Sequence, residues 1–548
     1  MNVIEKIKEL IFSQIQSIFK LEQSQLKNIE VSLITDDSKQ QFGDMTTNAA
    51  MVLARELKKN PRELAQNLIK SVEHEYIEKL ELAGPGFVNI FLSAKALKQL
   101  ALELYVQKDK FYQTETCPKI NYNVEFVSAN PTGPLHLGHG RGGIIGDVFG
   151  NVIRFLSDQA TKEFYINDAG SQIQKLGHSF KVRCLQNLGE TAELPEEGYQ
   201  GQYLVELAEK FVKQHGNKLK EYPDEIFARY AKEQMLKNIE NTLKKYGIHF
   251  DVWFSEKTLH DDGSIEKALE LLKSKNFTYE KEGAVWFKST EFADDKDRVL
   301  KKQNGELTYV AADIAYLQNK FARGYNKLVM VLGQDHHSYV TRLKGICQAL
   351  GYDPEKLHII LYQLVTLKES GTVLKMSKRK GRGITLEDVI DEVGTDVARF
   401  FYLNRKADAH LEFDIDLALK HTEENPVYYV QYAYVRTKSI LNKAKEIDSL
   451  KNINEHDLKN LESEKGLLKK IVHLKDILEV IEATYQTHLL TYYTIELCQT
   501  FHSYYAQHKV IDEKDILTSR TRLAMMQLLS ENLKRCFNIL GISSPESM

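Results

Sequence analysis

The sequence predicts an α/β protein in three parts: an α+β domain in residues 1–110, a parallel-sheet domain in residues 111–414 and an all-α bundle in residues 415–548. Three observations predict this division. Helical and strand patterns mix in the first part, apolar strand patterns alternate with helical ones in the second, and strand patterns fade in the third. The chain of 548 residues has room for several domains, because one domain usually takes about 100–200 residues.

The first part contains both kinds of element. Residues 46–57 and 61–72 have apolar side chains at helical spacing, and an Asn-Pro pair between them ends one helix and starts the next. A Gly-Pro-Gly turn at residues 84–86 precedes a strand pattern in residues 87–92. We therefore expect a small sheet packed against helices.

The second part has the alternation that is typical of a parallel sheet with helical crossovers. Its strand patterns are residues 122–127, 163–168, 326–333 and 357–365. Charged helical sequence at about 180–245 interrupts the alternation and is expected to be an insertion. After residue 415, long amphipathic patterns with few glycines predict a helical bundle.

Composition narrows the class of protein. Hydrophobic residues make up 43% and charged residues 27%, as in ordinary globular domains, and the net charge of −3 means that any contact with nucleic acid must come from a local basic surface. The five cysteines stand singly, which excludes a CxxC zinc site and fits a reducing compartment. No signal peptide and no apolar run of ~18–20 residues occurs, so we expect a cytoplasmic protein without a membrane segment.

A first candidate site follows the strand pattern at residues 122–127. A turn rich in proline and glycine leads to HLGH and a helical pattern, in which His136 and His139 lie on one side of a turn. A helix N-terminus and imidazole N–H groups both suit phosphate. The helix start holds four glycines: Gly138, Gly140, Gly142 and Gly143. Glycine costs a helix ~1 kcal/mol relative to alanine, which points to something that approaches the backbone closely. The alternative is a glycine-rich turn with two satisfied histidines; a Walker A loop is excluded because GxxxxGK[ST] is absent.

A second candidate site is the basic run KMSKRK, which begins at Lys375 between glycine-containing segments. We expect a mobile loop whose lysines neutralise a departing pyrophosphate. The alternative is a solvated basic loop or a general nucleic-acid patch. Thr385 then predicts a helix start and Gly394 a helix end.

HLGH and KMSK in this order resemble the HIGH and KMSKS signatures of class I aminoacyl-tRNA synthetases. The resemblance implies a Rossmann-like catalytic domain in which His136 and His139 bind ATP phosphates and stabilise the transition state, together with Lys375 and Lys378. It places further residues at ATP, namely Gly138, Gly140, Met376, Ser377, Asn167 and Asp168. For Asn167 and Asp168 the alternative is an ordinary polar strand end.

Three stretches resemble the arginyl-tRNA synthetases in particular. They are EFVSANPTGPLHLGH with Glu125 and Asn130, the run from residue 294 to 325 with Tyr309 and Asp313, and VLGQDHH with Gln334. The resemblance implies that these five residues bind arginine. Guanidinium is a permanently charged planar fork of five N–H donors, so Glu125 and Asp313 are the expected carboxylate partners and Tyr309 and Gln334 complete the wall. Without the resemblance, Glu125 is a strand-end carboxylate and Asp313 a helix cap.

The resemblance extends over essentially the whole chain and implies its partners. It implies an arginine–tRNA ligase that forms arginyl-adenylate from L-arginine and ATP with substrate-associated Mg²⁺, transfers arginine to tRNA(Arg), and works as a monomer. Tyrosines interleaved with cations in residues 425–440 predict RNA contacts at Tyr432 and Arg436 in an anticodon-binding bundle, although the same spacing fits a core helix. Residues 1–110 are expected to contact the outer corner of the tRNA.

Three rival classes stay open. A cysteinyl-tRNA synthetase would need thiolate zinc ligands, which single cysteines do not supply. A small-molecule nucleotidylyltransferase also uses HxGH but would leave the helical tail without a purpose. A non-catalytic tRNA-binding relative is disfavoured by intact HLGH and KMSK.

Overall fold

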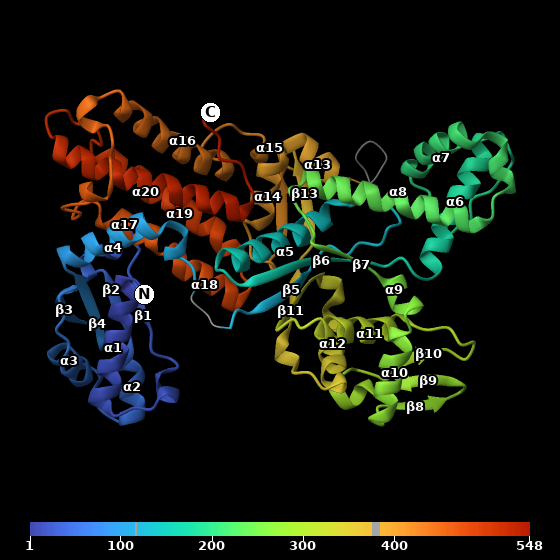
Figure 1. Ribbon diagram of the computed structural model, residues 1–548, viewed down its shortest axis with the longest axis horizontal. Helices are drawn as coiled ribbons and strands as arrows, with labels where there is room; N and C mark the ends of the chain where they lie inside the picture. The colour runs from blue at the N-terminus through green and yellow to red at the C-terminus, as the bar shows by residue number, and fades with distance from the viewer. Residues whose placement is uncertain (115–117, 375–383) are drawn as a thin grey trace.

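The computed structural model describes residues 1–114, 118–374 and 384–548. Figure 1 shows the N-terminal domain and the C-terminal helices side by side at one end of an elongated molecule. The parallel sheet lies in the middle, and helices α6 to α8 extend from the other end. Ion pairs join the two neighbouring ends of the chain, with Lys469 Nζ 3.0 Å from the buried Asp44 carboxylate and Lys8 Nζ 2.8 Å from Asp476.

The N-terminal domain is an antiparallel sheet in the order β1-β2-β4-β3 with helices packed on it. Its strands are β1 Val31–Leu33, β2 Met45–Thr47, β3 Ile77–Ala83 and β4 Phe87–Leu92, and its helices are α1 Val3–Phe19, α2 Ala49–Leu57, α3 Pro61–Ser71 and α4 Ala94–Gln107. The strand at residues 87–92 is confirmed, and α3 starts at Pro61 as predicted, with Asn60 accepting from the N–H of Arg62. The predicted helix start at residue 46 is wrong. Residues 45–47 pair with strands on both sides and alternate in burial, so sheet pairing overrides the helical spacing.

The central sheet is parallel, in the order β12-β11-β5-β6-β7. Its strands are β5 Asn121–Glu125, β6 Gln159–Ile166, β7 Val252–Ser255, β11 Lys327–Gly333 and β12 Leu357–Tyr362. The expected parallel sheet is confirmed. The single strand expected at residues 357–365 is two: β12 ends at Tyr362, the N–H of Gln363 turns to the carbonyl of Ala407, and β13 joins a second sheet. That sheet has the order β14-β13-β15, with β13 Val365–Glu369, β14 Thr372–Leu374 and β15 Leu411–Asp414.

The same part of the chain contains further helices and a small antiparallel sheet. The helices are α5 Leu137–Phe155, α6 Ser171–Asn187, α7 Gln202–His215, α8 Asp224–Lys245, α9 Glu256–Asp261, α10 Ser264–Ser274, α11 Tyr309–Ala322 and α12 His337–Leu350. The strands β8 Thr278–Lys281, β9 Ala284–Phe287 and β10 Arg298–Lys301 form the small sheet. The segment α6 to α8 lies where the insertion was expected and has an apolar core of its own that includes Phe180, Phe211 and Phe227.

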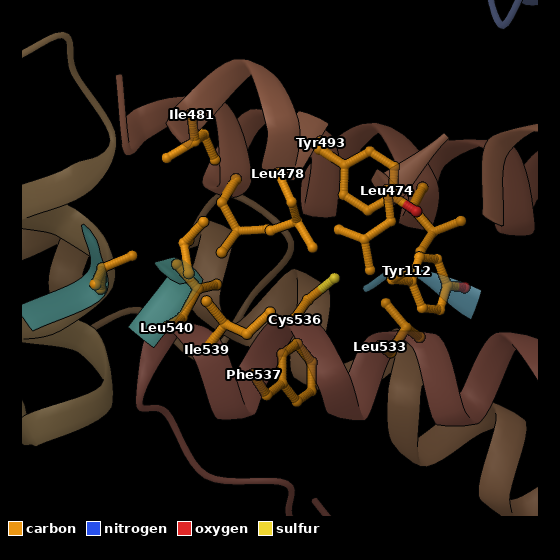
Figure 2. Close-up of a cluster of buried hydrophobic side chains, with 14 of the residues drawn as sticks. Tyr112, Leu474, Leu478, Ile481, Tyr493, Leu533, Cys536, Phe537, Ile539 and Leu540 are labelled. Carbon is orange, nitrogen blue, oxygen red and sulfur yellow. The ribbon is translucent and has the colours of Figure 1, made fainter. Parts of the chain in front are cut away.

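From residue 415 onward, the described chain is helical, as predicted. Two helices precede β15 in the chain, α13 Leu386–Val393 and α14 Thr395–Leu403. The helices from residue 415 onward are α15 Ile415–Ala418, α16 Pro426–Lys445, α17 Lys465–Val472, α18 Leu474–Thr484, α19 His488–Gln507 and α20 Ile516–Leu540. Figure 2 shows Tyr112 at one end of a cluster of buried side chains of this bundle, beside Leu474, Tyr493 and Leu533. The Tyr112 hydroxyl donates to Asn532 at 2.7 Å. The segment that leads into β5 is therefore anchored in the bundle.

A buried arginine joins the bundle to the central domain. Arg399 on α14 is fully buried; its guanidinium donates to the carbonyls of Leu540 at 2.9 Å and Tyr246 at 2.8 Å, and to the carboxylate of Asp147 at 2.5 Å. Asp147 belongs to α5 and also pairs with Lys162 Nζ at 2.6 Å. The ends of α20 and α8 are thus fastened to the helix that begins at HLGH.

Candidate active site

A cavity of about 910 Å³ opens at the carboxyl ends of the parallel strands, where ligands of open α/β sheets bind. The loop after β5, the start of α5, the start of α9, one face of α11 and the segment after β11 line it. The predicted site residues in its wall are Glu125, Asn130, His136, Gly138, His139, Asn167, Tyr309 and Asp313. The fold therefore brings together residues from five separate segments.

Two stacked histidines form one wall. His136 caps α5, its Nδ1 accepts from the N–H of Gly138 at 3.1 Å, and His139 Nδ1 accepts from the N–H of His136 at 3.2 Å. The ring centroids lie 3.7 Å apart. Burial lowers the pKa of His139 to about 3, with the His136 charge adding to the effect, and burial also lowers the pKa of His136. Both rings are therefore neutral at pH 7, and since each Nδ1 accepts a hydrogen, each ring offers its Nε2–H as a donor.

The glycines at the start of α5 serve two purposes. Gly138 lines the cavity, where a side chain would crowd the His136 ring. Gly140 and Gly142 face the protein instead: a Cβ on Gly140 would lie 2.7 Å from Leu386, and one on Gly142 2.6 Å from the ring of Tyr362. Gly140 is not in the cavity wall. We expected these glycines to allow a ligand close to the backbone. At Gly140 and Gly142, glycine instead allows other parts of the protein to pack closely against α5.

Residues 375–383, which contain Lys375, Met376, Ser377 and Lys378, lie outside the described residues. The chain that follows them is described and lies beside HLGH. Thr385 forms a bridge with His136, and the N–H of Leu386 donates to the carbonyl of Leu135 at 2.8 Å. Thr385 caps α13 and Gly394 ends it, as predicted.

A pair of acids forms the opposite wall. Glu256 begins α9 directly after β7 and is 4% exposed, and Asp313 is half-buried on α11, where the hydroxyl of Tyr339 donates to it. Burial raises the pKa of Asp313 to about 7, against the hydrogen bond from Tyr339, and the charge of Glu256 raises it further. Burial also raises the pKa of Glu256, which hydrogen bonds from Tyr165 and His260 oppose. Burial disfavours the ionised form of both carboxyls, so a positively charged partner is favourable for each of them and the pair forms a site that favours a cation.

Sequence reasoning missed Glu256, which is the residue directly after β7. Its only local signal is that it follows a strand, and the order of the strands is needed to place it opposite Asp313. We expected Glu125 to share the guanidinium with Asp313. In the structure, Asp313 lies near both Glu256 and Glu125, and the charge of each raises its pKa.

Glu125 already has partners within the protein. One of its oxygens accepts from the buried Lys320 Nζ at 2.5 Å, and the other accepts from Ser128 Oγ at 3.1 Å. The Ser128 hydroxyl also accepts from the N–H of Tyr165, which holds the loop against β6. Val127 and Ser128 have φ of 66° and 38°, a strained conformation for residues other than glycine, and such strain is common at functional sites.

Besides Gly140, two further predicted residues, Asp168 and Gln334, lie beside the cavity and not in its wall. The Asp168 carboxylate accepts from Ser255 Oγ at 2.8 Å and from the N–H of Lys257 at 3.1 Å, so it fastens the turn after β6 to the start of α9. Gln334 begins the short helix Gln334–His336 between two wall residues, Gly333 and Asp335.

The predicted RNA-contacting residues lie on α16 in the bundle. Tyr432 is half-buried and stacks near Tyr428 and His502, and exposed Arg436 lies 5.0 Å from the centroid of the Tyr505 ring. The buried face of α16 consists of other residues, including Val430, Ala433, Tyr434 and Thr437. The core-helix alternative therefore does not describe Tyr432.

Within residues 1–114, 118–374 and 384–548, no helix is both long and apolar enough to cross a membrane. In the same residues, no group of three or more His, Cys, Asp or Glu side chains has the arrangement of a metal site.

Comparison with known proteins covers nearly the whole chain. Residues 5–92 match the arginyl tRNA synthetase N-terminal domain, residues 101–414 match the class I (R) tRNA synthetase catalytic domain, and residues 430–548 match the DALR anticodon binding domain.

Individual relatives agree. The arginine–tRNA ligase of Caldanaerobacter subterraneus subsp. tengcongensis is 42% identical over 99% of this chain and 98% of its own length, and arginine–tRNA ligase 1 of Halalkalibacterium halodurans is 40% identical over the full length of both. The crystal structure of a putative arginyl-tRNA synthetase from Campylobacter jejuni superposes with a TM-score of 0.76 at 35% identity, over 83% of this chain and 100% of that one. The Thermus thermophilus arginyl-tRNA synthetase shares the fold, with a TM-score of 0.75 at 20% identity over 99% of this chain and 100% of that one. With its cavity, its paired histidines and acids, and this likeness along its full length, the chain belongs to the arginyl-tRNA synthetase family.

Proposed function

We propose that the chain is an arginine–tRNA ligase that activates L-arginine with ATP and transfers it to the terminal ribose of tRNA(Arg) in the cavity at the end of the parallel sheet. One observation carries the proposal. Two acids, Asp313 and Glu256, line the same cavity as two neutral histidines at a helix N-terminus. The acids suit a guanidinium and the histidines suit phosphate.

The phosphate end is assigned to α5. The Nε2–H groups of His136 and His139 donate to phosphate oxygens, and the backbone at Gly138 leaves room for them. Neutral donors in a buried place strengthen as negative charge grows on the phosphates, which stabilises the transition state more than the bound substrate. Asn167 in the wall is assigned to the same nucleotide. Lys375, Met376, Ser377 and Lys378 are proposed as partners of ATP on the strength of the family motif.

The amino-acid end is assigned to two walls. Asp313 and Glu256 receive the guanidinium, and binding it turns both acids into full carboxylates. Tyr309, the first residue of α11, lies at the mouth beside them. Glu125 and Asn130 come from the loop that leads to His136, so they lie at the reacting end, where they receive the α-amino group while the arginine carboxylate attacks the α-phosphate.

Mg²⁺ is treated as part of the nucleotide substrate. Mg²⁺ keeps several waters and binds substrate phosphates more readily than protein cages. The described residues of the cavity fit this, because Glu125 is paired with Lys320 and Asp313 lies with Glu256 against tyrosines. No step is assigned to the ion.

RNA binding is assigned to the two ends of the chain. Tyr432 and Arg436 on α16 offer a stacking ring and an exposed cation for the anticodon region. The domain in residues 1–110 is proposed to contact the outer corner of the tRNA. We propose that the protein works as a monomer in the cytoplasm, following the family.

Charging assays test the proposal directly. Purified protein is offered each amino acid in turn with ATP and tRNA, and we expect aminoacylated tRNA with arginine only. Arginine-dependent exchange of pyrophosphate into ATP measures the first step separately and is expected to require tRNA. Loading of another amino acid, or nucleotidyl transfer to a small molecule without tRNA, would contradict the assignment.

A further inference from the structure

A row of side chains on α11 runs from the cavity to the interior behind it. Tyr309, Asp313, Tyr316 and Lys320 recur at spacings of three and four residues, which places them on one face of the helix. The first two line the cavity and the last two do not. Lys320 is 0% exposed, and its ammonium lies between the Glu125 carboxylate and the ring of Tyr316, whose centroid is 4.5 Å away.

The ion pair of Lys320 with Glu125 is separate from the nearby ion pair of Arg323 with Glu163. One turn further along, Arg323 binds both oxygens of Glu163 at 2.6 and 2.8 Å, and Tyr316 donates to the same carboxylate. Glu163 is therefore satisfied without Lys320. Glu163 is not in the cavity wall, whereas Glu125 is.

A buried lysine is expensive unless it is paired, so its position calls for an explanation. The groups near Glu125 are Lys320, Tyr316 and Asp313 of α11, Ser128 of its own loop and Tyr165 of β6. Lys320 is the cation of this set, and it approaches from the side of the protein interior. The carboxylate keeps its other side toward the cavity.

We propose that Lys320 is a positioning residue for the amino acid: its buried ammonium pairs with the Glu125 carboxylate and orients it so that a free lone pair receives the α-ammonium group of arginine. This inference rests on the proposed function. It gives the acids of the cavity different tasks. Asp313 and Glu256 receive the guanidinium, while Glu125, held in place by Lys320, receives the α-ammonium group.

The inference predicts how the protein distinguishes arginine from 5-guanidinopentanoate, which is arginine without the α-amino group. Binding of each ligand to the full chain is measured by calorimetry. The wild type is expected to prefer arginine by at least about tenfold, the usual value of a hydrogen bond between charged groups. Lys320→Met is expected to lose most of that preference while its affinity for the analogue changes by less than about threefold.

Arg323→Gln is the matched control, because it removes a cation from the same helix that pairs with an acid outside the cavity. It is expected to lower stability and leave the preference for arginine intact. A general disturbance of α11 would weaken both ligands equally in both variants, and that result would overturn the proposal. So would a Lys320→Met variant with the full preference.

A double variant covers the case in which Lys320→Met alone does not fold, since it leaves a buried carboxylate without its partner. Lys320→Met combined with Glu125→Gln removes both charges. If Lys320 acts through Glu125, the double variant has the same weak preference as Glu125→Gln alone. A further loss of preference in the double variant would overturn the proposal.

The binding assay separates failure of the inference from failure of the function. Asp313→Asn is expected to abolish binding of both ligands, because both carry the guanidinium. If Asp313→Asn leaves the binding of both ligands unchanged, the cavity is not the arginine site, and the role of Lys320 is contradicted as well. Binding that depends on Asp313 and not on Lys320 removes the role of Lys320 alone.

Discussion

Arginine binding should release a proton, and the structure gives the size of the effect. The pKa of Asp313 in the free cavity is raised to about 7 by burial and by the charge of Glu256. The guanidinium binds the ionised form, so a protonated Asp313 must lose its proton first. At pH 7 about half of the free molecules hold that proton, and binding should release about half a proton per arginine, rising toward one at pH 6 and falling toward zero at pH 8.

The affinity for arginine must depend on pH through the same proton on Asp313. Only the deprotonated cavity binds, so affinity strengthens as pH rises and levels off above pH 7. The apparent Kd should be about tenfold weaker at pH 6 than at pH 8, since a drop of one pH unit below the pKa costs about tenfold. The raised pKa of Glu256 acts in the same direction.

Calorimetry in two buffers with different heats of ionisation counts the released protons. Glu256→Gln is the informative variant, because it removes the charge that helps to hold the proton on Asp313. We expect weaker binding and a pH dependence displaced to lower pH. Constant affinity between pH 6 and pH 8, with no difference in heat between the buffers, would refute the reasoning.

Three further predictions follow from the site and its supports. His139→Ala should lower arginine-dependent pyrophosphate exchange by about 10²–10³-fold in a folded protein, as expected for a lost transition-state donor; near-normal exchange would remove its role. Gly142→Ala should destabilise the fold by about 1–3 kcal/mol, because its Cβ would lie 2.6 Å from the Tyr362 ring, and an unchanged melting temperature would show that α5 can shift. Arg436→Ala should weaken tRNA binding and flatten its salt dependence in filter assays while the Kd of arginine stays the same; a changed arginine Kd would contradict the separation of the sites.

Periodicity and motifs predicted the architecture because they are local signals. The parallel sheet, the helical tail, the capped helix at Thr385 and the clustering of His136 with Asp313 all follow from short patterns whose physics depends on neighbours in sequence. Strand boundaries were less certain. Residues 45–47 have the spacing of a helix, and only pairing with β1 and β4 makes them a strand.

The acid pair could not be predicted in the same way. Glu256 and Asp313 come close because α9, which follows the edge strand β7, packs against α11. The residues next to either acid in the sequence do not reveal this contact. The glycines of α5 show the opposite error. Their number correctly indicated crowding, but the crowding at Gly140 and Gly142 comes from Leu386 and Tyr362.

The buried guanidinium of Arg399 means that residues 415–548 cannot be removed from the chain without disturbing the central domain. It satisfies the last turn of α20 and the carboxylate on α5 with one group, so deleting the tail would remove one of the three acceptors of a cation buried inside the protein. A shortened enzyme without residues 415–548 would therefore lose part of the support of α5, the helix that begins at HLGH, as well as the helical domain proposed to bind RNA. Grafting this tail onto a related synthetase would need the arginine, its aspartate and the helix end to be transplanted as a single unit.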